Sequence, residues 1–201
     1  MQFFIKPLKL GSSLLPLAGL VTLSPAQGQP IVPNTDGTGT MVIPNGDRFD
    51  IDGGQLSDDG ANLFHSFDRF GLDSGQSANF LSTPDIQNIL GCITGGDPST
   101  IDGLIQVSGS NANLFLINPA GVVFGPNATL NVSGDFTATT ATGIEFENGG
   151  WFDAIGANDW GSLVGAPSGF AFAATISNGS PFAPGAIVNE GNLEVATGRH
   201  F

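Results

Sequence analysis

The residues able to perform acid–base or metal chemistry are few and lie far apart along the chain. The two histidines, His65 and His200, form no H-E-x-x-H or other metal-ligand spacing. The adjacent acids Asp58 and Asp59 are typical of a solvated strand face, because a catalytic carboxylate pair must flank the bond that it cleaves. The sequence contains no G-x-S-x-G turn, phosphate-binding loop or dinucleotide fingerprint. These patterns predict a protein that is not an enzyme and holds no cofactor.

One enzymatic alternative stays open, a polysaccharide lyase, which needs basic residues beside acids to stabilise an enolate-like charge. The arginines are Arg48, Arg69 and Arg199, and their scatter argues against such a site. Acids clustered beside an arginine in a groove would favour it. Residues 50–54, DIDGG, resemble a calcium loop but lack the third acidic position and the distant glutamate. We therefore expect no metal site.

The chain has one cysteine, Cys92, which excludes an intrachain disulfide and a cysteine-based metal centre. It lies in the apolar run of residues 89–93. This context predicts a buried and unreactive thiol.

The charge is strongly acidic, with 18 Asp and Glu against 5 Lys and Arg in 201 residues. Two of the cations, Lys6 and Lys9, lie in the first ten residues. Without that segment the net charge is −15, because 18 acids face three arginines. Such a surface repels phosphate backbones, so we expect no nucleic-acid partner.

Residues 1–28 have the pattern of a secretory signal peptide. Lys6 and Lys9 form its positive start, residues 10–23 its apolar centre, and cleavage is expected after Ala26 or Gly28. The apolar run of 14 residues is shorter than the ~20 that span a bilayer, so no permanent membrane anchor is expected.

The remaining chain reads as short strands separated by Gly, Asn, Asp and Pro. In residues 185–195, alternation points Ile187, Leu193 and Val195 inward and places Gly191 at a corner. His65 is expected to be an exposed strand residue. Residues 84–90 fit one or two helical turns, but residues 89–94 fit a strand equally well, and we favour a strand entered from a turn. The candidate strands cover residues 41–43, 49–51, 62–64, 104–107, 114–117, 121–124, 129–132, 136–141, 144–146, 186–189 and 192–196.

One buried face per strand, with Asn and Gly at corners, favours a parallel β-helix, although a β-sandwich produces much of the same pattern. Coils of about 20 residues predict six or seven turns, with asparagine side chains stacked between coils. Residues 148–179 hold Trp151 and Trp160 and read as a hairpin packed on the side of the stack. We expect these aromatic residues to seal that side.

Two sequence blocks resemble a known family. Residues 62–80, NLFHSFDRFGLDSGQSANF, contain its N-x-F-x-x-F pattern, and residues 113–122, NLFLINPAGV, resemble its most characteristic stretch. The family is the two-partner-secretion domain, also called the haemagglutination activity domain, that begins filamentous haemagglutinins and related exoproteins. The resemblance covers about residues 30–196. The usual N-P-N-G turn has Ala120 in its third place, but Pro119 and Gly121 should preserve the turn.

The resemblance implies an all-β, right-handed parallel β-helix of the pectin-lyase-like, single-stranded type, with an N-terminal β cap and side hairpins. It implies a secreted, adhesin-like exoprotein domain that reaches the cell surface through the periplasm. Its partner would be the periplasmic part of a dedicated outer-membrane transporter; host-cell or surface glycans are a second class of partner. The candidate recognition residues are Asn62, Phe64, Phe67, Phe70, Asn118, Pro119 and Gly121.

The expected organisation is a leader over residues 1–28, a secretion domain over residues 29–180, and the start of a repeat region over residues 181–201. Because exoproteins of this family continue far beyond this point, we expect a truncated or partial chain. A stand-alone carbohydrate- or surface-binding module stays open as an alternative. An exposed aromatic strip from Trp151, Phe152 and Trp160 would favour that module.

Overall fold

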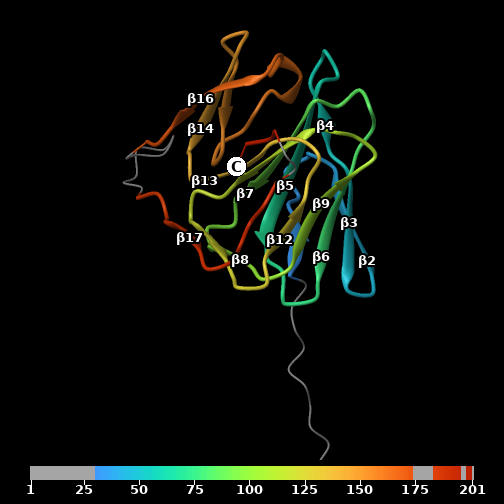
Figure 1. Cartoon of the computed structure of the whole chain (residues 1–201). Coiled ribbons are helices and arrows are strands. Elements are labelled where there is room, and N and C mark those ends of the chain that lie inside the picture. Colours follow the sequence, from blue (N-terminus) through green and yellow to red (C-terminus); the bar gives the residue numbers. More distant parts are fainter. Residues whose placement is uncertain (1–29, 174–182, 196–197, 201) are drawn as a thin grey trace, which may run out of the picture.

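The computed structural model describes residues 30–173, 183–195 and 198–200, which form a parallel β-helix, as the sequence predicts (Figure 1). Three sheets run along the stack, and a fourth, antiparallel sheet lies beside it. The helical content of the described residues is one short 3-10 turn, η1 (Trp160–Ser162). The expected leader, residues 1–28, lies outside the described residues.

The strands of each sheet come from successive coils. Sheet A contains β1 (Ile31–Pro33), β4 (Gln55–Leu56), β5 (Asn62–Phe70), β7 (Asn88–Ile93), β10 (Asn113–Ile117) and β13 (Phe136–Thr139). Sheet B contains β2 (Thr40–Asn45), β3 (Arg48–Gly53), β6 (Ser77–Leu81), β9 (Leu104–Ser108) and β12 (Thr129–Asn131). Sheet C contains β8 (Ser99–Ile101), β11 (Val122–Phe124) and β17 (Ile187–Asn189). The side sheet contains β14 (Gly143–Phe146), β15 (Trp151–Asp153) and β16 (Pro167–Ala171).

The chain visits sheets B, A and C in turn, and each strand pairs in parallel with its equivalent in the next coil. Equivalent asparagines in sheet A are 26 and 25 residues apart. The stack therefore has about four turns, and the expectation of six or seven was wrong. Each coil is longer than expected because it contains corner loops as well as three short strands.

Antiparallel strands close the first coil. β1 and β4 both pair with β5, and β2 pairs with β3 as a hairpin. This arrangement is the expected N-terminal β cap. It blocks further parallel growth at that end of the stack, so open pairing edges there are short or hairpin strands.

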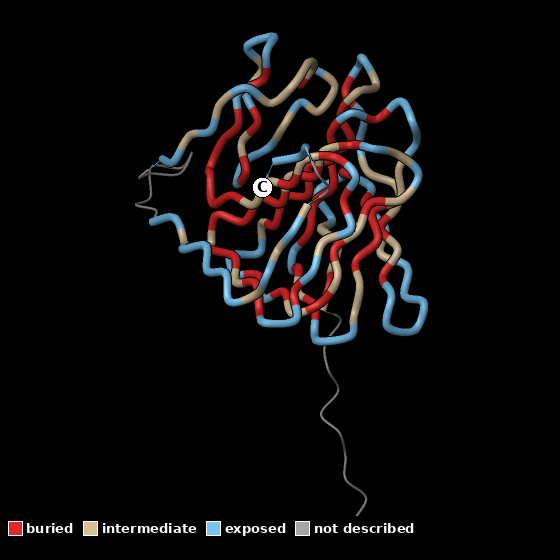
Figure 2. The backbone as a smooth tube through the Cα atoms, viewed as in Figure 1, coloured by how far each residue is buried: buried red, intermediate tan, exposed pale blue. Residues whose placement is uncertain are grey.

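A hydrophobic core fills the stack, and its phenylalanines come from β3, β5, β6, β11 and β13. Figure 2 shows the buried segments running through the middle of the stack. Sheet A is also covered on its outer face, where Leu90 and Cys92 pack in a second cluster beneath the side sheet. Strands buried on both faces read as continuous apolar runs. This explains β7, in which all six residues are buried, and it confirms both the strand predicted there and the buried thiol of Cys92.

A ladder of asparagine side chains joins the coils at the start of each sheet A strand. Asn88 Nδ2 donates to Asn62 Oδ1 at 2.8 Å, and Asn113 Nδ2 donates to Asn88 Oδ1 at 3.0 Å. Asn113 Oδ1 then accepts the Asp135 backbone N–H at 2.9 Å. Asp135 Oδ1 in turn accepts the His200 N–H at 3.0 Å, so the ladder crosses the whole stack. The predicted stacking of asparagines is confirmed.

Three local expectations were wrong. His65 is fully buried rather than exposed, because it shares the inward face of β5 with Phe67. Ile187 pairs in register with buried Val122 but is 46% exposed, because β17 is the last described strand of sheet C. Residues 192–195 form no strand, although Leu193 and Val195 do pack against the core.

Candidate recognition site

Two of the candidate phenylalanines of β5, Phe67 and Phe70, lie inside the coil. Their exposed fractions are 0% and 1%, and their ring centroids are 5.2 Å apart. Phe80 of β6 completes the group, at 6.3 Å from Phe67 and 6.1 Å from Phe70. These rings fix the distance between sheets A and B, and neither candidate ring is reachable from solvent in the folded protein.

The third candidate, Phe64, points out of the coil and is covered by the side sheet. It is fully buried, with ring centroids 6.1 Å from Phe146, 6.4 Å from Phe152 and 5.3 Å from Trp160. The N-x-F-x-x-F pattern thus alternates between two cores, because residues 64 and 67 fall on opposite faces of a strand. Phe64 is therefore one of the contacts that attach the side sheet to the stack.

Asn62 links the same two parts through hydrogen bonds. Its Nδ2 donates to the carbonyl oxygens of Leu163 and Gly165, each at 2.8 Å, while its Oδ1 accepts from Asn88. Its side chain is completely buried. Every polar atom of this amide is paired within the fold, so the folded protein offers none of them to a partner.

The second block forms the turn between β10 and β11. The Gly121 N–H donates to Asn118 O at 3.0 Å, and Gly121 has φ +124°, so the turn survives with Ala120 in its third place. Asn118 Nδ2 donates to Asp97 O and Ser99 Oγ, and its Oδ1 accepts the Ala120 N–H at 2.9 Å. The Gly185 N–H donates to Pro119 O, so the turn also holds the segment that enters β17.

Both blocks contribute strands to sheet A, the first to β5 and the second to β10, two coils away. Asn62 begins β5 in the first coil, whereas Asn118 follows the end of β10 in the third. All seven candidate residues are buried. They therefore form no common surface in the folded protein, and each has a structural task instead.

Two titratable side chains are buried among these elements. Burial lowers the pKa of His65 to about 4, against a smaller opposing effect of the Asp52 carboxylate, and neither ring nitrogen has a hydrogen-bond partner among the described residues. Burial also raises the pKa of the Cys92 thiol, whose Sγ lies 3.3 Å from Ala154 O. Both groups are thus uncharged at neutral pH and unsuited to exchange protons with a ligand.

Sequence reasoning expected stacked asparagines but did not name Asn88 or Asn113. A signal was present, because Asn62, Asn88 and Asn113 each precede two apolar residues at spacings close to one coil. Sequence reasoning also missed Arg199 as a pocket residue. Its position depends on the final described segment returning beside the third coil, which no local pattern encodes.

The structure meets only in part the conditions set for the two alternatives, a surface-binding module with an exposed aromatic strip and a lyase with acids beside an arginine. Of the three aromatics proposed as a strip, Phe152 and Trp160 pack inside the second cluster, and only Trp151 is largely exposed, at 54%. The pocket that contains Arg199 has no acidic residue among its lining residues. No set of three metal-binding side chains gathers among the described residues. None of their helical segments has the length and apolarity to cross a membrane.

Comparison with known proteins gives one family. The model of the TPS secretion domain matches residues 29–200. Among solved structures, 13 chains match. One is the crystal structure of the HMW1 secretion domain from Haemophilus influenzae, with 26% identity and a TM-score of 0.41. That match covers 57% of this chain and 27% of the HMW1 chain, so this protein spans about a quarter of its length. No curated protein matches the chain.

Proposed function

The chain belongs to the family of TPS secretion domains, and we propose that it directs an exoprotein to its outer-membrane two-partner-secretion transporter. The match to the family model over residues 29–200 is the observation that carries this proposal. The family is one of secretion-targeting domains, so the proposed activity is recognition followed by export, without a chemical step.

The architecture suits this task. Each coil pairs only with its neighbours, so folding can proceed coil by coil as the chain emerges from a pore. Burial of each new apolar face outside the membrane then favours outward movement. The antiparallel cap gives the first coil a finished end on which later coils can assemble.

We propose that the transporter reads the candidate residues before the domain folds. Asn62, Phe64, Phe67, Phe70, Asn118, Pro119 and Gly121 are all buried in the folded state, which supports this order of events. In an extended chain the same side chains are free to bind. An extended segment can also add as a strand to a sheet edge of the transporter's periplasmic domains. Folding would then release the partner.

Residues 1–28 are proposed to serve as the leader that brings the chain to the periplasm. An adhesin-like role, with glycans as partners of the exported protein, is a further proposal that rests on the resemblance. The division between a secretion domain, residues 29–180, and a repeat region, residues 181–201, is proposed on the same grounds.

The test is secretion with and without a cognate transporter. We expect the chain in the culture medium only when the transporter is present, and in the periplasm when it is absent. Retention in the periplasm in both cases, with the transporter shown to export another substrate, would sink the proposal.

A further inference from the structure

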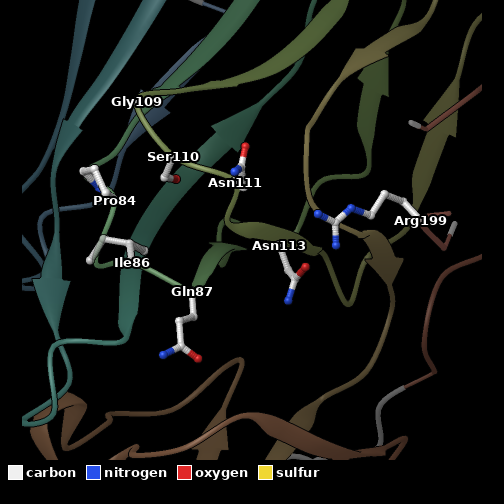
Figure 3. Close-up of a pocket in the computed structure, with 8 residues that line it drawn as sticks. All are labelled: Pro84, Ile86, Gln87, Gly109, Ser110, Asn111, Asn113 and Arg199. Carbon is white, nitrogen blue, oxygen red and sulfur yellow. The ribbon is translucent and has the colours of Figure 1, made fainter. Parts of the chain in front are cut away.

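A polar pocket of about 680 Å³ lies where sheet B turns into sheet A. Pro84, Ile86 and Gln87 of the second coil's corner form one wall, and residues 109–113 of the third coil form the floor. Arg199 closes the opposite side, and its guanidinium reaches toward Asn111 and Asn113 (Figure 3). The volume falls within the range of about 300–1,000 Å³ that small-molecule sites occupy.

The backbone beneath this pocket is held in place. Gly109 has φ +95°, and a Cβ at this position would collide with Ser82 O of the preceding coil. The amide of Asn113 is fixed by its bonds to Asn88 and to the Asp135 N–H. Ser110 Oγ accepts the Ala112 N–H at 3.2 Å. The floor is therefore preformed, which lowers the ordering cost of binding a ligand.

Three lining side chains have no hydrogen-bond partner among the described residues. They are the carboxamides of Gln87 and Asn111 and the guanidinium of Arg199, all on exposed residues. Planar amide and guanidinium groups offer paired donors and acceptors at fixed spacing. Pairs of neighbouring hydroxyls on a sugar ring match that spacing. Exposed Pro84, backed by the buried Ile86, provides an apolar surface for the ring's C–H face.

The charge of the molecule selects among sugars. The formal net charge is −13. Asp85 lies between the lining residues Pro84 and Ile86, and the Asp135 backbone N–H donates to Oδ1 of the lining residue Asn113. One arginine in such a field attracts an acidic polymer weakly, because the long-range potential repels it. A neutral sugar meets no such barrier and still hydrogen-bonds to the guanidinium.

We propose that this pocket binds a neutral oligosaccharide, with Arg199, Gln87 and Asn111 as its principal hydrogen-bonding residues. The site lies on the outer surface of the stack, and none of its three principal hydrogen-bonding residues belongs to either sequence block. It would therefore be available on the exported, folded domain, and it does not depend on the proposed role in secretion.

The experiment titrates the folded chain with maltotetraose, cellotetraose and mannotetraose at millimolar concentration, followed by ¹H–¹⁵N NMR. We expect at least one tetramer to shift the side-chain amide signals of Gln87 and Asn111 and the Arg199 Nε signal. Arg199→Gln should weaken that binding at least about tenfold, which corresponds to the loss of one charge-assisted hydrogen bond. Arg69→Gln, the same change at an exposed arginine on β5, should leave it unchanged.

Three results would overturn the proposal. The first is the absence of shifts with all three tetramers in a sample whose spectrum is that of a folded protein. The second is tighter binding of tetragalacturonate than of the neutral tetramers, which would assign an acidic ligand. The third is loss of binding in Trp151→Ala but not in Arg199→Gln, which would place the sugar on the exposed indole of the side sheet.

Discussion

Sheets A and C are built by the same coils, yet they differ in how completely they are buried. Sheet A packs against the core on its inner face and against the side sheet on its outer face, so every residue of β7 is buried. Sheet C has strands of three residues, and in β8 and β11 the two outer residues are buried while the central residue is exposed or half-buried. Coil stacking alone buries one face of a strand.

The second buried face of sheet A comes from one insertion. The chain leaves the fourth coil after β13, builds the side sheet, and returns to the stack at β17. Phe64 and Asn62 attach this insertion, and the Asn118–Gly121 turn receives the returning chain. The two sequence blocks therefore include the places where the insertion joins the stack. This explains the burial of Asn62 and Phe64, whereas Phe67 and Phe70 are buried in the coil core.

Replacing a core residue of sheet A should have the largest effect on stability. Ile89 is completely buried in β7. Ile89→Ala should lower the free energy of unfolding by about 4 kcal/mol, because the smaller side chain buries less apolar surface and leaves a cavity that its neighbours cannot fill. Urea unfolding of the purified chain measures the change. A loss below about 1 kcal/mol would show that burial in sheet A stabilises the fold less than the contrast with sheet C requires.

The buried His65 should make stability depend on pH. Its pKa is about 4 in the fold against 6.5 unexposed, so the unfolded chain takes up the proton first as pH falls. The free energy of unfolding should decrease from pH 6.5 to pH 4, by up to about 3 kcal/mol, and show no further loss from this group below that range.

The carboxylates also titrate in the lower part of this range, so the measurement compares the chain with His65→Leu. The difference between the two should grow as pH falls from 6.5 to 4 and be small at pH 8, because the leucine takes up no proton. Parallel pH profiles for the two proteins would show that His65 is hydrated or paired in the fold.

The asparagine ladder should stabilise the coils by a smaller amount. Asn88→Ala leaves Asn62 Oδ1 and Asn113 Nδ2 without their partners in a buried region, which should cost about 2 kcal/mol. Asn131→Ala removes an exposed asparagine of β12 and is the matched control. Equal effects of the two substitutions in urea unfolding would mean that the ladder contributes specificity of register rather than stability.

The smallest effect is expected in sheet C. Ile187→Ala makes the same chemical change as Ile89→Ala, but Ile187 is 46% exposed in β17. The free energy of unfolding should fall by no more than about 0.5 kcal/mol. A loss close to that of Ile89→Ala would remove the contrast between the two sheets.

Much of the stack was predictable from local pattern, because alternation and corner residues act over a few positions. The strands predicted at residues 104–107 and 114–117 fall within β9 and β10, and the strand predicted at residues 121–124 overlaps β11. β6 and β8 were missed because their short sequences, SANFL and STI, contain too many polar residues to show a strand pattern. Pairing with parallel neighbours in the adjacent coils holds them in place.

Local sequence pattern could not predict three features: the number of coils, the burial of His65 and the covering of sheet A. Corner loops of variable length set the coil spacing, and no periodicity in a window of a dozen residues reports it. His65 is polar, so its burial follows from alternation with Phe67 and from the cap above it rather than from its type. The side sheet reaches Phe64 from about 80 residues away, a contact that only the fold creates.

The central claim is that the transporter reads the two sequence blocks before folding buries them. The most direct test measures binding of immobilised transporter periplasmic domains to the chain, either fully folded or just diluted from urea. The account predicts binding of the diluted chain that declines as folding proceeds, and little binding of the folded chain. Equal and lasting binding by the folded chain would contradict it, and would direct attention to an exposed edge such as β2 instead.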